Sequence, residues 1–212
     1  MGDIEYVNLT EDLAEACHRL EISAFPEADP DGLLSEEDIR VFAGVFPEGF
    51  FVALEDGVPV GQGAGIFIDF DFATQVQHTI TSLCGPHQCD NHDPDGEWYY
   101  GVDIVVADSH RGRGIGRALY DLRKDLVQRH GKHGIIAGGD LPGFPAHMAD
   151  MDVETYVQKV VEGELSDPTL TMQLNNGFEV RGVIHDYLPH AHGEDAASLI
   201  VWENPQWHDG RG

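Results

Sequence analysis

The stretch that decides the fold of this chain is Arg111-Gly112-Arg113-Gly114-Ile115-Gly116-Arg117. It follows an apolar, strand-like run over residues 99–106 and precedes a segment whose apolar residues recur at helical spacing as far as His130. A glycine-rich turn that opens a helix leaves backbone N–H groups unpaired, and these donors lie at the positive end of the helix dipole. Gly114 and Gly116 carry no Cβ, so a phosphate can approach the backbone closely. The turn is therefore predicted to bind a phosphorylated ligand.

Cations are concentrated around this turn. The chain carries 38 acidic and 12 basic residues, which gives a formal net charge of -26 at pH 7, yet seven of the twelve cations lie between residues 111 and 132. A solvated helix face explains any one of them but not their concentration. Several phosphates in one ligand would explain it, and the pyrophosphate of coenzyme A, with the terminal phosphate of its nucleotide, fits best. The seven cations are Arg111, Arg113, Arg117, Arg123, Lys124, Arg129 and Lys132.

The rest of the surface is predicted to be strongly acidic. Negative charge at this density repels itself at low salt and is screened in concentrated salt. Because the acidic residues are spread over the whole chain, we interpret them as a halophilic adaptation to a salt-rich cytoplasm. A surface that attracts cationic substrates is the competing interpretation. The same charge balance argues against nucleic acid as a partner.

Length and composition predict a single domain over residues 1–212. No long apolar run indicates a membrane span, and no basic segment followed by an apolar core is visible near Met1. The three cysteines do not form a disulfide framework, so a reducing cytoplasm is expected. The oligomeric state is left open, with a homodimer among the alternatives.

The order of the expected elements predicts an α+β fold with a mixed sheet, because hairpin-like strand pairs occur together with one β-α-β unit. Ser35, followed three residues later by Asp38, is typical of a capping box and predicts a helix that ends near Phe46. Thr10 is expected to cap a helix that runs to about Ala24. Strands are expected over residues 5–9, 50–54, 60–70, 99–106, 135–139, 178–184 and 197–202, and further helices over 115–130, 152–161 and 168–176.

These landmarks resemble the GNAT superfamily of acyl-CoA N-acyltransferases, whose cofactor motif is Arg/Gln-x-x-Gly-x-Gly/Ala between a strand and a helix. Arg111 to Gly116 match the motif, and a strand near Ile135 and a helix that ends in Asn176-Gly177-Phe178 follow in order. The resemblance covers residues 4–203. A narrower resemblance is to acetyltransferase domains attached to carbon–nitrogen hydrolases, although no hydrolase domain lies within these 212 residues.

The resemblance implies transfer of an acetyl group from acetyl-CoA to a primary amine of a small molecule or peptide, by direct attack in a ternary complex. It implies a mostly antiparallel sheet with splayed central strands, where the backbone of Ile104, Val105 and Val106 pairs with pantetheine. The turn from Arg111 to Arg117 would wrap the pyrophosphate. Many relatives use a Tyr on the last helix as the general acid, but the matching position here is Gln173, so the acid is unassigned. The alternative function is a non-catalytic acyl-CoA-binding sensor or partner module.

Asp103 is the predicted general base. Amine acylation requires a neutral amine and removal of a proton, and a carboxylate just before the cofactor-binding run can act directly or through water. Because side chains alternate along a strand, that of Asp103 is expected to point opposite to those of Val102 and Ile104. The alternative is a structural aspartate that bonds nearby backbone groups. Secondary candidates are Tyr99, Tyr100 and His110, although strand tyrosines are more often core residues and His110 flanks the turn.

Two further segments are assigned from their composition and length. Residues 71–97 are polar and predict a loop; the potential zinc ligands in it match no common spacing, so no metal is expected. Residues 141–166 are longer than a connection needs and are interpreted as an insertion, either a wall of the acceptor pocket or an elaboration packed on the sheet. Residues 204–212 are expected to form a tail. The potential zinc ligands are Cys84, His87, Cys89 and His92, and a solvated loop is expected to hold His185, His190 and His192.

Overall fold

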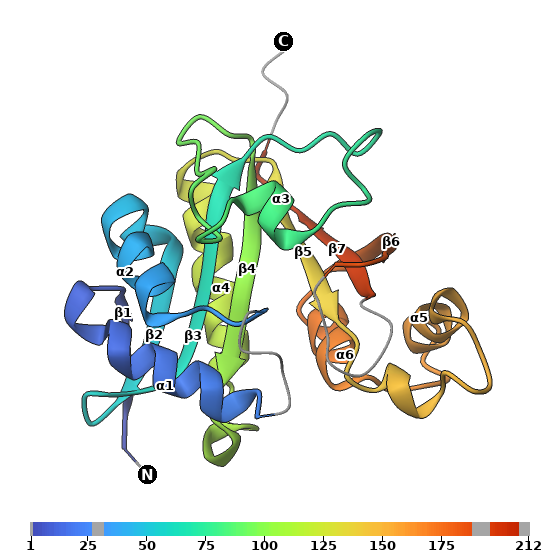
Figure 1. The fold of residues 1–212 in the computed structure, drawn as a ribbon, viewed down its shortest axis with the longest axis horizontal. Coiled ribbons are helices and arrows are strands. Elements are labelled where there is room, and N and C mark those ends of the chain that lie inside the picture. Colours follow the sequence, from blue (N-terminus) through green and yellow to red (C-terminus); the bar gives the residue numbers. More distant parts are fainter. Residues whose placement is uncertain (1, 27–31, 188–195, 208–212) are drawn as a thin grey trace.

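The computed structural model describes residues 2–26, 32–187 and 196–207, so His190, His192 and the last five residues of the predicted tail lie outside the described residues. Figure 1 shows the elements. The strands are β1 (Ile4–Asn8), β2 (Phe50–Glu55), β3 (Val58–Ile68), β4 (Trp98–Val106), β5 (Gly134–Asp140), β6 (Glu179–Ile184) and β7 (Ala197–Glu203). The helices are α1 (Ala14–Ala24), α2 (Glu36–Val45), α3 (Ile80–Cys84), α4 (Ile115–Arg129), α5 (Val153–Val161) and α6 (Pro168–Asn175).

The strands form a seven-stranded sheet in the order β1-β2-β3-β4-β5-β7-β6. Neighbouring strands are antiparallel except β4 and β5, which are parallel. Helices α1, α2 and α3 pack with one hydrophobic core on one face of the sheet, which we call the α1 face (Figure 1). Helices α4, α5 and α6 pack with the second core on the other face, the α4 face. The predicted α+β fold with a mixed, mostly antiparallel sheet flanked by helices is confirmed.

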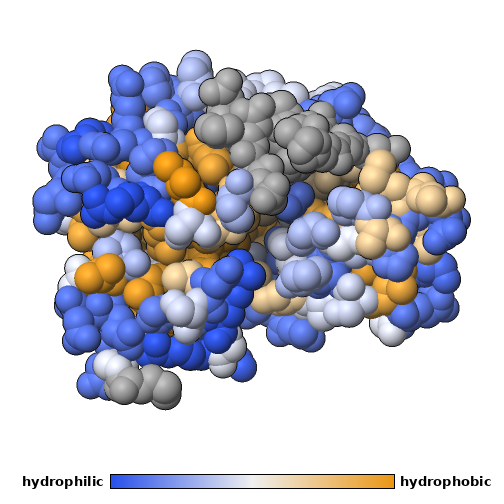
Figure 2. Space-filling view, turned by 60° about the horizontal axis from the view of Figure 1, so that its bottom comes forward, coloured by the Kyte–Doolittle hydropathy of each residue, from blue (hydrophilic) through white to orange (hydrophobic). Residues whose placement is uncertain are grey.

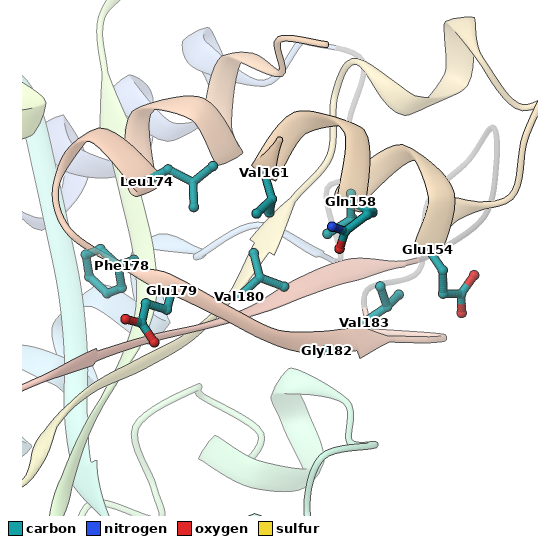
Figure 3. A pocket seen from close by; sticks show the side chains of 10 residues that line it. Glu154, Gln158, Val161, Leu174, Phe178, Glu179, Val180, Gly182 and Val183 are labelled. Atoms are coloured by element: carbon teal, nitrogen blue, oxygen red, sulfur yellow. The ribbon is translucent and has the colours of Figure 1, made fainter. Parts of the chain in front are cut away.

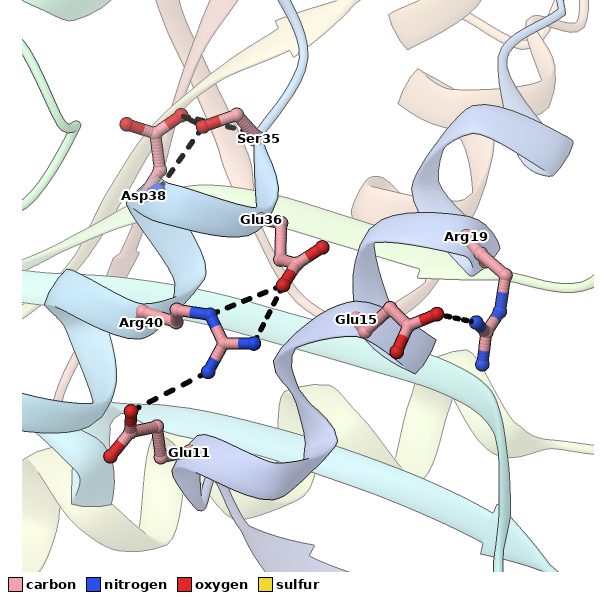
Figure 4. Close-up of polar contacts among 7 residues, drawn as sticks. All are labelled: Glu11, Glu15, Arg19, Ser35, Glu36, Asp38 and Arg40. Atoms are coloured by element: carbon pink, nitrogen blue, oxygen red, sulfur yellow. Dashed lines mark hydrogen bonds and ion pairs between the residues drawn. The ribbon is translucent and has the colours of Figure 1, made fainter.

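Helix α2 begins where the sequence predicts it, with a complete capping box (Figure 4). The backbone N–H of Asp38 donates to Ser35 Oγ at 3.1 Å, and the backbone N–H of Ser35 donates to Asp38 Oδ2 at 2.8 Å. Arg40 pairs with Glu36 and reaches Glu11 beside the start of α1, but these side chains are exposed and their ion pairs contribute little stability. Local hydrogen bonding therefore fixes this helix start.

Two local predictions were wrong. The Thr10 side chain makes no capping hydrogen bond; a 3₁₀ turn over Glu11–Leu13 follows it, and α1 begins only at Ala14. Within the expected loop over residues 71–97, Thr79 and Ser82 form a capping box and start the short helix α3. The single apolar turn of α3 is too short to show helical periodicity in the sequence.

Strands β4 and β5 separate in the middle of the sheet. They pair only over Trp98–Gly101 with Gly134–Ala137, after which β4 stays with β3 and β5 stays with β7. Val102 is an extra residue at this point, because the register with β3 steps from Gly101 opposite Gly65 to Asp103 opposite Ala64. The splay implied by the resemblance is confirmed, and we call the opening beyond Gly101 and Ala137 the strand fork.

Arg123 of α4 supports this bulge from the α4 face. It is 2% exposed, and its Nη2 donates to the carbonyl oxygens of Ala64, at 3.0 Å, and Asp103. Its guanidinium also lies over the rings of Tyr99 and Tyr120. One of the seven clustered cations is thus a structural part of the sheet and not a phosphate ligand.

Lys124 and Lys132 are also engaged in packing. Lys124 Nζ donates to the Asn176 carbonyl at 2.6 Å, and Lys132 Nζ donates to the Pro94 carbonyl at 2.7 Å. The hypothesis that the whole cluster serves phosphates was therefore too broad. Hydrogen bonds to backbone carbonyls account for three of the seven cations, and an anion site can use only the remainder.

The segment over residues 141–166 contains α5, whose apolar stripe packs toward α6 and β6. An open pocket at this edge of the sheet is lined by residues of α5, α6 and β6 (Figure 3). Val157 and Val180 contribute apolar surface, and Glu154 and Glu179 contribute carboxylates. Residues 141–166 remain a proposed insertion. No helix in the described part of the chain is long and apolar enough to cross a membrane.

Candidate acyl-CoA site

The glycine turn lies at the N-terminus of α4 and exposes its backbone. Gly112 and Gly114 have φ values of 75° and 83°, and no atom lies within 4 Å of a Cβ built on either residue. Gly114 occupies the N-cap position without a side chain to cap the helix. None of the described residues accepts a hydrogen bond from the backbone N–H groups of residues 112–117. The turn is therefore an open row of donors at the positive end of a helix dipole.

The three arginines of the turn differ in their freedom to move. Arg113 has a side chain only 20% exposed, and it donates to Glu55 Oε1 at 2.7 Å. The side chains of Arg111 and Arg117 are 61% and 80% exposed, and their partners, Asp108 and Asp121, are exposed as well. Arg111 and Arg117 can swing toward a bound anion, whereas Arg113 braces the turn against the end of β2.

Glu55 is a site residue that the sequence analysis missed. Its second carboxylate oxygen lies 2.8 Å from His110 Nε2, so one carboxylate joins His110, which precedes the turn, to Arg113 within the turn. The hydrogen bond from Arg113, with that of His110, lowers the pKa of Glu55 to about 2. The sequence places Glu55 in a hairpin turn, and only the sheet brings it beside a segment more than 50 residues away.

Ile104 and Val106 turn their backbone groups into the strand fork. The N–H of Ala107 donates to the Val60 carbonyl at 2.9 Å, and alternate residues of an antiparallel pair turn to opposite edges. Residues 104 and 106 therefore face away from β3, on the side that β5 has left, whereas Val105 faces Gln62 of β3. A hollow between the N-terminal and C-terminal halves of the molecule exposes apolar residues (Figure 2).

Asp103 lies on the α1 face in a buried cluster with Glu21 and Gln62. Gln62 Nε2 donates to Asp103 Oδ2 at 3.0 Å and to Glu21 Oε2 at 2.9 Å, and Glu21 is only 3% exposed. Burial raises the pKa of Asp103 to about 6. Burial and the Asp103 charge raise the pKa of Glu21 well above its usual range. Burial and mutual repulsion therefore disfavour the state in which both carboxyl groups are ionised.

The predicted direction of Asp103 was half right. Ile104 packs against the core of the α4 face, opposite to Asp103, as expected. Val102 packs against the core of the α1 face, on the same side as Asp103, because the bulge breaks the alternation. A signal for Glu21 was available, since it follows Cys17 by four residues and so continues the buried stripe of its helix.

The two candidate tyrosines point to opposite faces. Tyr99 lies on the α4 face, where its hydroxyl donates to the Gly49 carbonyl at 2.8 Å, which is a structural role. Tyr100 lies on the α1 face with its hydroxyl near two other polar side chains.

Gln173 of α6 is buried against Gly139 of β5, and a Cβ built on Gly139 would lie 2.4 Å from Gln173 Oε1. A neutral amide at this position cannot act as an acid.

Of the four potential zinc ligands, the two cysteines are buried and the two histidines have other partners. Cys84 and Cys89 are buried thiols, and burial raises the pKa of each. His87 Nδ1 lies 3.0 Å from Asp90 Oδ1, and His92 Nδ1 accepts from the Phe67 backbone N–H at 3.2 Å. Among the residues that the structure describes, no three His, Cys, Asp or Glu side chains group as metal ligands would.

Comparison with known proteins adds independent findings. A model of the acetyltransferase (GNAT) family matches residues 14–147. Two proteins of Bacillus subtilis (strain 168) are similar: the probable hydrolase YhcX, 34% identical over 164 residues or 77% of this chain, and the uncharacterized N-acetyltransferase YkwB, 29% identical over 198 residues or 93% of this chain. This chain spans 31% of the length of YhcX and 87% of the length of YkwB. In fold, it resembles the loading GNATL domain of CurA from Lyngbya majuscula, with a TM-score of 0.82, 16% identity, and coverage of 95% of this chain and 98% of that one.

Proposed function

This chain belongs to the GNAT family of acetyltransferases, and from that premise we propose that it transfers the acetyl group of acetyl-CoA to a primary amine of a small molecule or peptide. One observation carries the proposal: β4 runs along the strand fork, and after the short 3₁₀ helix Asp108–His110 the chain enters the open glycine turn. A ligand with a pyrophosphate at one end and an acyl group at the other matches that order of sites.

The proposed binding mode uses backbone groups first. The free N–H groups of residues 112–117 hold the pyrophosphate, and Arg111 and Arg117 add charge from exposed positions. The backbone groups of Ile104 and Val106 take the place of β5 as partners for the amides of pantetheine. An N–H near Val106 then lies where it can stabilise the oxyanion that forms during attack on the thioester.

Asp103 is the proposed base for the incoming amine. A primary amine arrives as an ammonium ion, which cannot attack until it loses a proton. The carboxylate of Asp103, which Gln62 holds beside Glu21, attracts that ammonium and accepts the proton. The acidic composition supports the further proposal that the protein works in a salt-rich cytoplasm. The same composition supports an amine as the acceptor and argues against nucleic acid as a partner.

The second candidate function is a non-catalytic acyl-CoA sensor, which Gln173 at the usual acid position favours. Thiol release from acetyl-CoA, measured against a panel of amines in molar KCl, separates the two. Release that depends on an amine supports the enzyme, whereas tight CoA binding without release for any amine supports the sensor.

Binding at the turn is tested by Gly114→Asp, which places a carboxylate against the pyrophosphate. We expect CoA affinity to fall by about 3 kcal/mol, or roughly 100-fold, in calorimetry. Gly163→Asp is the matched control, because Gly163 also has a positive φ, of 77°, and free space around its Cβ. Unchanged CoA binding in a folded Gly114→Asp protein would remove the turn from the site.

A further inference from the structure

Three polar side chains form a hydrogen-bonded chain on the α1 face. Tyr100 Oη of β4 lies 2.9 Å from Tyr187 Oη, which follows β6, and 2.7 Å from Nε2 of His78, which precedes α3. His78 Nδ1 lies 2.7 Å from the Gln75 carbonyl oxygen. Tyr100 and Tyr187 are buried and His78 is partly buried, and the role proposed for Asp103 uses none of them.

The chain reaches the strand fork. Tyr100 lies opposite Ile136, one position before the last pair of β4 with β5. Gly138 is the first residue of β5 without a partner on β4, and its backbone lies close to the side chains of both tyrosines. A Cβ on Gly138 would lie 2.4 Å from Tyr187 Cζ, so the Tyr187 ring packs directly on the backbone of the fork.

The hydrogen-bond partners determine the direction of the chain. The Gln75 carbonyl can only accept, so His78 Nδ1 carries the proton. Burial lowers the pKa of His78, which keeps the ring neutral at pH 7 and leaves a lone pair on Nε2. The Tyr100 hydroxyl must then donate to His78, and the Tyr187 hydroxyl must donate to Tyr100. The Tyr187 hydroxyl oxygen can thus still accept a proton at the fork. Each hydroxyl would then pass its own proton to the next member of the chain, in the direction of His78.

The surroundings do not supply a competing charge. Besides the two hydroxyls, Phe70 contacts the His78 ring, and the Cys84 thiol of α3 lies near both tyrosines. Burial raises the pKa of Cys84, so the thiol is neutral at pH 7. Within the described ranges, no charged side chain contributes to the shift in the pKa of His78.

We propose that Tyr187, Tyr100 and His78 form a proton relay that takes the proton released by the attacking amine nitrogen and returns it to the sulfur of coenzyme A. The inference rests on the proposed function. The C–N bond forms, the C–S bond breaks and one proton moves from nitrogen to sulfur, so the step needs no other reactant. Asp103 acts earlier, on the ammonium ion. The relay supplies the acid that Gln173 cannot provide.

Three variants test the relay. Tyr187→Phe and Tyr100→Phe interrupt it, and His78→Gln removes its proton store. We expect each to lower kcat by roughly 100-fold or more with CoA affinity unchanged in calorimetry. Tyr156→Phe is the matched control, because it also deletes a buried hydroxyl that donates a hydrogen bond, at 2.9 Å to Asp167 Oδ2. Tyr156 lies on α5 and is not part of the relay. Tyr156→Phe should lose stability but keep kcat and its pH profile.

The pH profile separates a catalytic relay from a structural cluster. The relay needs a neutral His78, so His78→Gln should lose the acidic limb that belongs to the imidazole, whereas Asp103→Asn should retain it. If wild-type protein acetylates an amine and Tyr187→Phe has a kcat within about threefold of it, the relay is wrong and the proposed function stands. If wild-type protein acetylates no amine, both are wrong.

Nitrogen NMR of the wild-type protein tests the proton direction without turnover and without a variant that must fold. We expect the ¹⁵N shifts of His78 at pH 7 to show a neutral ring protonated at Nδ1. An imidazolium, or a ring protonated at Nε2, would reverse the donors and acceptors along the chain and overturn the proposal.

Discussion

Replacing Arg123 with methionine should weaken the whole fold, because this side chain holds the bulge at the strand fork. Met keeps much of the volume of Arg but carries no donor, so the carbonyl oxygens of Ala64 and Asp103 lose their partner. Each hydrogen bond from a charged donor contributes roughly 1.5–3 kcal/mol, which gives a gross loss of about 3–6 kcal/mol. The substitution also removes the cost of burying the guanidinium charge, which offsets part of this loss. We therefore expect the free energy of unfolding to fall by about 2–4 kcal/mol.

Urea unfolding in molar KCl measures this loss in the free energy of unfolding. The slope of that free energy with urea concentration is compared between variants. Arg129→Met is the matched control, because Arg129 ends the same helix but is exposed. It should cost less than about 1 kcal/mol. A loss for Arg123→Met no larger than that of the control would refute the structural role. The Arg123 charge also lowers the pKa of Asp103, so Arg123→Met should move the part of the activity profile that depends on Asp103 to higher pH.

Three other perturbations test the remaining assignments. Asp103→Asn should lower turnover by roughly 100- to 10,000-fold with nearly unchanged CoA affinity; turnover within a few-fold of wild type from pH 6 to 9 would return Asp103 to a structural role. Because Glu55 has a folded pKa of about 2 against a usual value of 4.5, its contribution to stability is present above pH 4.5 and disappears as the pH falls toward 2. Glu55→Gln should therefore flatten the acid unfolding profile in that window, and an unchanged profile would contradict the Arg113 contact. The melting temperature should rise from low to molar KCl because the net charge is -26, and a flat or falling curve would count against salt adaptation.

Local rules were sufficient for the parts of this protein that depend on neighbouring residues. The glycine turn, the start of α4 and the capping box of Ser35 follow from backbone conformation and hydrogen bonds between residues a few positions apart. Alternation and helical spacing predicted most strands and helices for the same reason. Thr10 shows the limit, since a good capping residue was followed by a 3₁₀ turn and not by the expected cap.

The sequence by itself thus determined the fold class, the family resemblance and the position of the glycine turn at the start of α4. Only the tertiary structure decided which charges are free, since Arg123 is buried beneath the sheet and Arg113 is held by Glu55, 58 residues away along the chain. It also decided the direction of Asp103, because the extra residue at Val102 breaks the alternation of side chains. Tyr100 and Tyr187 meet across 87 residues. Contacts of this kind depend on strand register and helix packing, which no local pattern specifies.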